Sequence, residues 1–177
     1  MDIYSSWRLA TEMANATHTR VIVPEYRGYG MRGGTPDPEG TVVDIGRVLM
    51  GLSASHVVGF SVGAALAAQV CVNNPHVKSI TLISPFYSLE RMATRIVGKV
   101  FASMMLHHNP IFNTSKWLPL AKAPIFILHG SMDRLIPMSD GHELSKLANT
   151  TFMTDEGAGH ENINYEHVYE WLRVRIC

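Results

Sequence analysis

The chain has 177 residues, with 15 Lys and Arg against 15 Asp and Glu, and 46% of its residues are hydrophobic. This length fits one domain, and a formal net charge of zero gives no positive field to hold a nucleic acid. Charged residues make up 17%, below the roughly 25% of ordinary globular domains, which excludes a disordered chain. We therefore expect a single domain over residues 1–177 that does not bind nucleic acid.

The cysteine content and the N-terminus indicate a protein of a reducing compartment. Cys71 and Cys177 are too few for a disulfide framework or a zinc site. The first ten residues carry an acid at position 2 and no apolar core of signal-peptide length. The longest apolar stretch, residues 62–72, is too short to cross a bilayer. We expect a cytoplasmic protein.

Helical and strand patterns alternate along the chain. A helical spacing of apolar residues at 2–16 is followed by a β-branched strand at Val21–Val23, a loop rich in Gly and Pro at 26–40 and a helix at 41–52. The same alternation then predicts strands at 56–60, 79–84, 124–129 and 150–154, with helices at 62–72, 138–148 and 163–176. Strands separated by helices predict an α/β protein, with a mostly parallel sheet covered by helices on both faces.

Residues 85–120 interrupt this alternation and predict a lid-like insertion over one end of the sheet. A helical pattern runs from Leu89 to Met105, followed by two prolines before the next strand. Arg91, Arg95 and Lys99 share one stripe of this helix, which would suit peripheral contact with a membrane surface. The alternative is an ordinary amphipathic helix packed on the sheet.

The motif Gly59-Phe60-Ser61-Val62-Gly63 lies between an apolar strand and an alanine-rich helix. In such a G-x-S-x-G elbow, a strained strand-to-helix turn projects the serine hydroxyl, and the glycines two residues away on either side allow backbones to approach closely. Ser61 is thus the candidate nucleophile. The alternative is a serine that only caps the following helix.

A serine nucleophile needs a base, and the base needs an acid to orient it. His160 is the candidate base, because it lies in a Gly-rich loop between the last strand and the last helix. Asp133 is the candidate acid, since it follows the strand that ends at His129-Gly130, and active sites of open parallel sheets collect at that edge. Asp133 could instead be a turn residue, with Asp140 or Asp155 as the acid, and His160 could cap a carbonyl.

The chain resembles the α/β-hydrolase superfamily, and within it the Bem46-like group of ABHD13- and ABHD17-type serine hydrolases. The residues that carry the resemblance are Tyr26 to Gly30 with Gly33, Gly34 and Pro36, the elbow Gly59 to Gly63, His129 to Asp133 with Ile136-Pro137, and Gly157 to Asn162. The resemblance implies the catalytic roles proposed above for Ser61, Asp133 and His160. It also implies a small-molecule or lipid acyl ester or thioester as substrate, a palmitoyl thioester among them, with no cofactor or metal.

The resemblance also implies that the first three strands of the family fold are absent. The N–H of Val62 would supply one oxyanion donor, while the loop that supplies the second would be missing. In the family order, a strand would be absent between Val21–Val23 and residues 56–60, which leaves a gap in the sheet unless the first strand moves across. We therefore expect an N-terminally truncated hydrolase, with a catalytically impaired, partner-binding remnant as the alternative.

Overall fold

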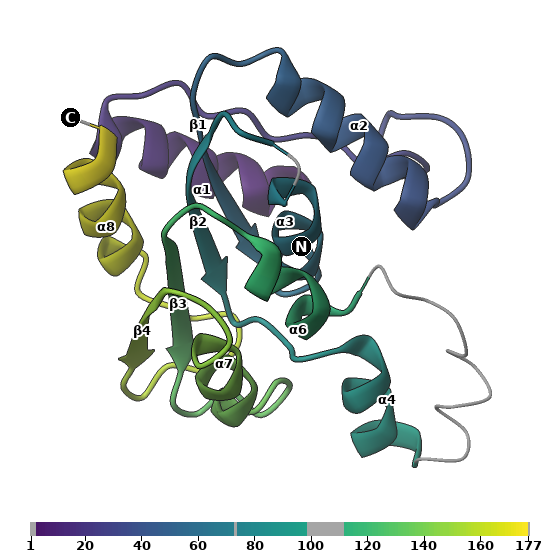
Figure 1. The fold of residues 1–177 in the computed structure, drawn as a ribbon, viewed down its shortest axis with the longest axis vertical. Helices are drawn as coiled ribbons and strands as arrows, with labels where there is room; N and C mark the ends of the chain where they lie inside the picture. The colour runs from purple at the N-terminus through teal and green to yellow at the C-terminus, as the bar shows by residue number, and fades with distance from the viewer. Residues whose placement is uncertain (1–2, 73, 99–111, 177) are drawn as a thin grey trace.

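A four-stranded parallel sheet forms the centre of the protein in the computed structural model (Figure 1). The structure describes residues 3–72, 74–98 and 112–176. In sheet order, which is also chain order, the strands are β1 (Ser55–Phe60), β2 (Val77–Ile83), β3 (Ile125–Gly130) and β4 (Thr150–Asp155). All three neighbouring pairs are parallel, so their carboxyl ends meet at one edge of the sheet.

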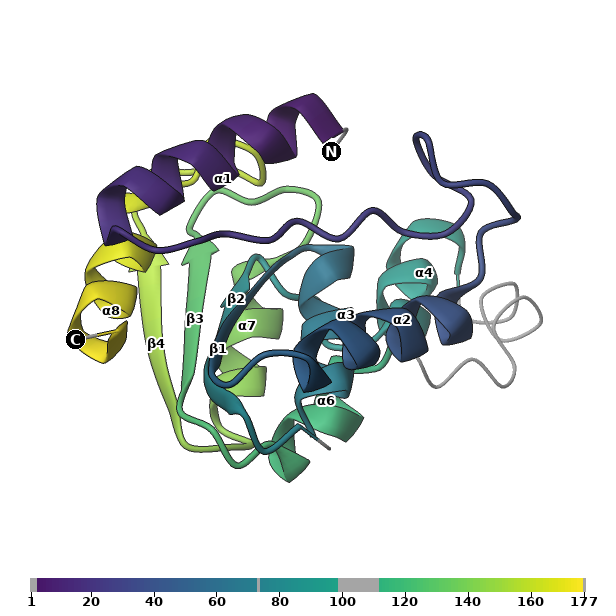
Figure 2. The same ribbon diagram turned by 90° about the horizontal axis from the view of Figure 1, so that it is seen from above.

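Helices cover both faces of the sheet (Figure 2). One face is covered by α1 (Ile3–Thr17) and α8 (Glu166–Ile176). The other face is covered by α2 (Pro38–Met50), α3 (Val62–Cys71), α6 (Thr114–Trp117), the 3-10 turn Leu118–Leu120 and α7 (Met138–Ser145). This confirms the predicted α/β class, a parallel sheet between two layers of helices.

Side chains alternate across the sheet and build one core on each face. In β3, Ile125 and Ile127 pack with the alanines of α3, while Phe126 and Leu128 pack with α1 and α8. Each of these four residues is at most 2% exposed. Strands buried on both faces read as continuous apolar runs, which is why β3 was recognisable in the sequence.

The strand predicted at Val21–Val23 is wrong. These residues belong to an extended segment without strand pairing that runs from α1 to α2, and Ile22 and Val23 are 46% and 42% exposed (Figure 2). Val21 packs on the same core as Val58 and Phe60 of β1. A β-branched run forms a strand only beside a hydrogen-bonding neighbour, and within the described residues the sheet ends at β1. The first strand therefore does not move across to close the expected gap.

Most other boundaries lie within three residues of the predictions. One of the larger differences is at α2, which begins at Pro38 rather than at residue 41. The Asp37 side chain accepts a hydrogen bond from the Gly40 N–H, and proline at the first helical position needs no N–H partner. Because of this cap and this proline, α2 begins three residues earlier, inside the loop predicted at 26–40.

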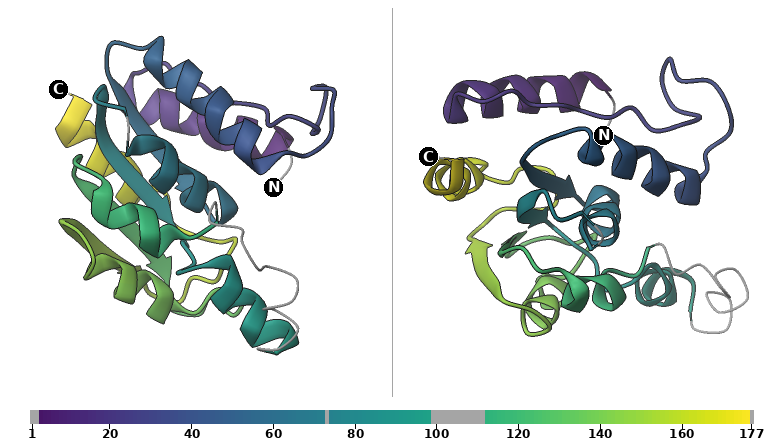
Figure 3. Two further views of the ribbon diagram at one scale, coloured as in Figure 1. Left: turned by 45° about the vertical axis from the view of Figure 1, so that its right-hand side comes forward. Right: turned by 45° about the horizontal axis from the view of Figure 1, so that its top comes forward.

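The segment after β2 carries the helix α4 (Leu89–Val97), which lies near α7 (Figures 1 and 3). Its Leu89 and Met92 pack on a buried apolar cluster, and Arg91 and Arg95, predicted to suit a membrane surface, pair with Glu143 and Asp140 of α7. The helix α4 begins where the Ser88 hydroxyl accepts from the Arg91 N–H and ends at Gly98. The rest of the helix predicted to reach Met105 lies outside the described residues. None of the helices described here is long and apolar enough to cross a membrane.

Candidate active site

Ser61 occupies a sharp turn between β1 and α3. Its backbone has φ 53° and ψ −115°, a conformation that L-residues adopt only at a cost of about 1–3 kcal/mol. The Ser61 N–H still donates to the Ile83 carbonyl, so the end of the sheet anchors the turn. The hydroxyl makes no capping bond to α3. The structure therefore does not use Ser61 as an ordinary helix cap, and its hydroxyl is directed elsewhere.

Asp133 lies in the turn that follows β3. Its Oδ1 accepts hydrogen bonds from the N–H groups of Leu135 at 2.9 Å and Ile136 at 2.8 Å. These bonds are those of an Asx turn, so the structural alternative raised from the sequence is also realised. They engage one carboxylate oxygen and leave Oδ2 free to take another partner.

His160 lies in the loop after β4, which is held against the Asp133 turn. The Met132 N–H donates to the Ala158 carbonyl at 2.9 Å. Gly130 permits this approach, because a Cβ there would stand 2.4 Å from the Ala158 oxygen and 2.7 Å from the Gly159 oxygen. A side chain at position 130 would push the two loops apart.

Ser61, His160 and Asp133 meet in one continuous line of polar contacts. The Ser61 Oγ lies 3.2 Å from the His160 Nε2, and the His160 Nδ1 lies 2.8 Å from the Asp133 Oδ2. The two other acids considered from the sequence are engaged elsewhere. Asp140 accepts from Arg95 and the Tyr87 N–H, and Asp155 accepts from the Asn164 N–H. Of the three candidate acids, the structure brings Asp133 to His160.

The surroundings of Asp133 favour its charged form. Burial alone raises the pKa of this carboxyl group, but hydrogen bonds from the Ile136 N–H and from His160 outweigh burial, so its pKa lies below the ordinary value of 3.8. The Asp133 side chain is fully buried, and that of His160 is 12% exposed. A buried carboxylate on Nδ1 fixes the imidazole tautomer that leaves Nε2 free to accept the serine proton.

Val62, the predicted oxyanion donor, is the first residue of α3. The first N–H groups of a helix have no intrahelical partner and point toward its N-terminal end. Phe60 precedes Ser61 in the sequence, and the centroid of its ring lies 4.9 Å from that of the His160 ring. The arrangement can bring a hydroxyl nucleophile, its base and one backbone donor to the same reacting carbonyl.

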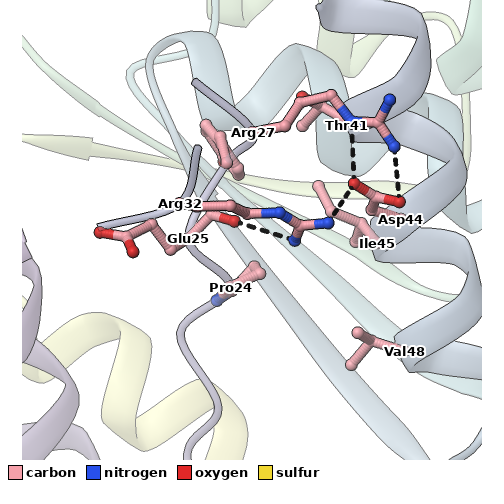
Figure 4. A pocket seen from close by; sticks show the side chains of 9 residues that line it. Pro24, Glu25, Arg27, Arg32, Thr41, Asp44, Ile45 and Val48 are labelled. Carbon is pink, nitrogen blue, oxygen red and sulfur yellow. Dashed lines mark hydrogen bonds and ion pairs between the residues drawn. The ribbon is translucent and has the colours of Figure 1, made fainter. Parts of the chain in front are cut away.

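The loop that contains Tyr26 and Arg27 is held against α2 by the ion pairs of Arg27 (Figure 4). The Arg27 guanidinium donates to both oxygens of Asp44, at 3.0 and 2.8 Å, and to Asp37 at 3.1 Å. Arg32 donates to the same Asp44 at 2.7 Å. Arg27, Arg32 and Asp44 line a pocket but already pair with one another, so we assign no ligand to it. The sequence motif did not reveal these ion pairs, because their acids lie 10 and 17 residues away.

The described part of the chain brings together no three His, Cys, Asp or Glu side chains that could hold a metal ion. Cys71 lies in the core, where burial raises the pKa of its thiol to about 12.

Comparisons with known proteins agree with this architecture. The uncharacterized protein Rv2307c of Mycobacterium tuberculosis is 27% identical over 168 residues, which cover 87% of this chain and 58% of that protein. The chain thus spans little more than half of this relative's length.

Solved structures of hydrolases share the fold. A meta-cleavage product hydrolase from Pseudomonas fluorescens (CumD) superposes with a TM-score of 0.72 at 14% identity, covering 99% of this chain and 86% of that one. A monoacylglycerol lipase from Paleococcus ferrophilus gives a TM-score of 0.70 at 17% identity, covering 98% and 90%. The sequence model of the Alpha/beta hydrolase family matches residues 3–121, which include the Ser61 elbow. The chain belongs to the alpha/beta hydrolase family.

Proposed function

We propose that this protein is a serine hydrolase that cleaves a carboxylic ester or an acyl thioester through an acyl-enzyme. The observation that carries the proposal is the line of contacts from Ser61 through His160 to Asp133, built from three loops that follow β1, β3 and β4. This order of nucleophile, acid and base along the chain is that of α/β hydrolases.

In the first half of the reaction, the Ser61 Oγ attacks the substrate carbonyl while the His160 Nε2 takes the hydroxyl proton. The charge that develops on the imidazole is stabilised by Asp133 through the 2.8 Å contact at Nδ1. The Val62 N–H stabilises the oxyanion, a contribution that typically changes the rate by about 100- to 1,000-fold per donor. Collapse of the tetrahedral intermediate breaks the bond to the leaving group, which takes the proton from His160.

In the second half, water attacks the Ser61 ester. The His160 Nε2 accepts a proton from this water, and the tetrahedral intermediate collapses by breaking the bond between the acyl carbon and the Ser61 Oγ. The same imidazole returns the proton to Oγ. The products are a free carboxylic acid and the regenerated enzyme.

Exposed apolar side chains support an acyl substrate with an apolar substituent. Val62 follows Ser61, Met132 precedes Asp133 and Leu135 lies two residues after Asp133, and these side chains are 45%, 57% and 55% exposed. Burying such side chains against an acyl chain is favourable by about 25 cal/mol per Å². We assign the segment 85–120 as a lid and small-molecule or lipid acyl compounds as the substrates. Within the family, we assign the protein to the Bem46-like group of ABHD13- and ABHD17-type hydrolases.

A catalytically impaired domain is the second candidate. The observation that favours it is the edge of the described sheet at β1, beside which Val21–Val23 run without strand pairing. In the part of the chain that the structure describes, the Val62 N–H is the one oxyanion donor that we assign. Loss of one donor reduces the rate without removing the triad.

Treatment with a fluorophosphonate probe separates the two candidates. We expect the parent protein to form a covalent adduct on Ser61 and the Ser61→Ala variant to form none. Ser53→Ala, which removes an exposed serine hydroxyl before β1, serves as the matched control and should label like the parent. A folded parent that does not label would overturn the hydrolase proposal in favour of the impaired domain.

A further inference from the structure

A second histidine lies directly beneath the acid of the triad. His129 is the penultimate residue of β3 and its side chain is fully buried. Its Nε2 lies 2.9 Å from the Ile136 carbonyl oxygen and 3.5 Å from the Asp133 Oδ2. Because a carbonyl oxygen only accepts hydrogen bonds, Nε2 must carry the proton, and the tautomer of His129 is therefore determined by Ile136.

The same residue, Ile136, holds Asp133 from its other side. Its N–H donates to the Asp133 Oδ1 at 2.8 Å, while its carbonyl accepts from His129. The turn from Asp133 to Ile136 is thus fastened to β3 by one imidazole N–H. The orientation of Oδ2 toward His160 depends on the position of this turn.

The other ring nitrogen of His129 has no partner among the described residues. Nδ1 is buried, and Gly141 packs so close that a Cβ there would stand 2.6 Å from it. An unpaired buried acceptor costs about 1–3 kcal/mol, which an apolar side chain of similar size would not incur. The imidazole of His129 therefore lowers the free energy of unfolding through its unpaired Nδ1, while its Nε2–H makes a hydrogen bond to the Ile136 carbonyl.

The groups that surround the ring favour a neutral imidazole. Burial lowers the pKa of His129 more strongly than the Ile136 carbonyl and the nearby Asp133 and Asp140 raise it. A neutral ring donates a hydrogen bond without placing a second positive charge beside His160. The buried carboxylate Asp133 therefore keeps His160 as its cationic partner during the reaction.

We propose that His129 is a positioning residue of the triad, whose Nε2–H holds the turn from Asp133 to Ile136 so that the Asp133 carboxylate stays directed at His160. This inference rests on the proposed function, because it assigns the positioning of the same triad. His129 acts through Asp133 and touches no substrate.

Three substitutions at this position separate the donor from the volume. His129→Gln places an amide N–H near the position of Nε2, whereas His129→Asn is too short to reach the Ile136 carbonyl, and His129→Leu carries no donor. The exposed His142→Asn on α7 is the matched control. We expect kcat on a short-chain aryl ester to fall about 100-fold in His129→Asn and His129→Leu, with KM nearly unchanged, because displacements of about 1 Å cost rates of this size.

The Gln variant provides the rescue. We expect His129→Gln to recover at least tenfold of the lost kcat and His142→Asn to match the parent. Equal losses in the Gln and Asn variants would overturn the inference, since the donor would then be irrelevant. Retention of the parental kcat by a folded His129→Asn would overturn it as well. Where His129→Leu does not fold, the comparison of Gln with Asn decides.

A spectroscopic arm makes the inference independent of turnover. The His160 Nδ1 proton, hydrogen-bonded to Asp133, should give a low-field proton NMR signal that is assigned by its absence in His160→Gln. We expect the signal in the parent and in His129→Gln, and its loss in His129→Asn. The same signal in all three proteins overturns the inference even if the parent shows no hydrolysis, a result that would separately overturn the proposed function.

Discussion

Gly59 packs directly against the backbone of Gly63. A Cβ added to Gly59 would stand 2.3 Å from the Gly63 carbonyl oxygen and 2.8 Å from the Ala64 Cα. A Cβ added to Gly63 would meet the Tyr26 hydroxyl at 3.6 Å, an ordinary contact distance. The two glycines of the elbow are therefore not equivalent. The close approach needs the first one, and the second contributes its backbone.

This difference predicts opposite effects of alanine at the two positions. Gly59→Ala should open the turn, lower the melting temperature and slow fluorophosphonate labelling of Ser61, because no real Cβ fits at 2.3 Å from a backbone oxygen. Gly63→Ala should fold with a stability equal to the parent or about 0.5–1 kcal/mol higher, since alanine favours a helix over glycine. Equal destabilisation in thermal melts of the two variants would contradict this assignment.

The backbone of Ser61 predicts that glycine is better tolerated than alanine at the nucleophile. Both variants lose the hydroxyl, but the φ of 53° with ψ −115° disfavours any side chain. We expect the free energy of unfolding of Ser61→Gly to be about 1 kcal/mol higher than that of Ser61→Ala. The relief of backbone strain by glycine is larger than the entropic cost of its flexible unfolded chain. Urea denaturation of the two unlabelled proteins measures this difference. An alanine variant as stable as the glycine variant would show that the turn is unstrained.

The contact between Asp133 and His160 predicts a large catalytic loss without a change in shape. Asp133→Asn should lower kcat by about 10,000-fold, because an amide stabilises the wrong imidazole tautomer. The exposed neighbour Glu161→Gln is the control and should hydrolyse esters at the parental rate. Steady-state kinetics with an activated ester measure both. A loss below tenfold in a folded Asp133→Asn would remove this carboxylate from the catalytic site.

The buried carboxylate of Asp140 predicts a stability effect separate from catalysis. Its side chain is fully buried and takes two hydrogen bonds from the Arg95 guanidinium and one from the Tyr87 N–H. Arg95→Gln should therefore cost about 2 kcal/mol of unfolding free energy, because it leaves a buried charge undercompensated. Arg8→Gln, which breaks an exposed pair with Glu12, should cost less than about 1 kcal/mol. Similar urea midpoints for the two variants would contradict the prediction.

The lowered pKa of His129 predicts that acid weakens the fold below neutral pH. Burial, its largest cause, keeps the native ring neutral, while the unfolded chain binds a proton near the ordinary pKa of 6.5. The unfolded state therefore holds more protons below pH 6.5, so the free energy of unfolding falls as the pH falls toward the lowered native pKa. His56, whose pKa burial also lowers, adds to this trend.

The measurement compares urea midpoints at pH 7.5 and pH 5.5 in the parent and in His129→Gln. The variant should lose less stability than the parent between the two values. Asp133 does not contribute between pH 5.5 and pH 7.5. Because its native pKa is lowered from 3.8, its charged form stabilises the fold at pH values above about 3.8, and this stabilisation is lost only at lower pH. An equal loss in both proteins would mean that His129 titrates alike in the folded and unfolded states.

Local patterns were sufficient for much of this molecule. The apolar and β-branched residues of β1 to β4 and the helical stretches between them identified a parallel α/β sheet, and the elbow around Ser61 was recognisable from five consecutive residues. These features depend on the preferences of neighbouring residues, which sequence periodicity records directly. The run Val21–Val23 has the same local preference and forms no strand, because pairing requires a partner that lies elsewhere.

The sequence and its family resemblance already favoured Asp133 as the acid, but only the tertiary structure showed it beside His160 while Asp140 and Asp155 bind other partners. The tertiary structure also gave Gly59 and Gly63 different roles and placed His129 beside the acid. The Ser61 and His160 side chains that meet at 3.2 Å are 99 residues apart in the chain. Contacts at such separations depend on how strands pair and loops pack in three dimensions. The sequence contains the order of these residues. Their distances in the folded protein determine that Asp140 pairs with Arg95 and that Asp133 orients His160.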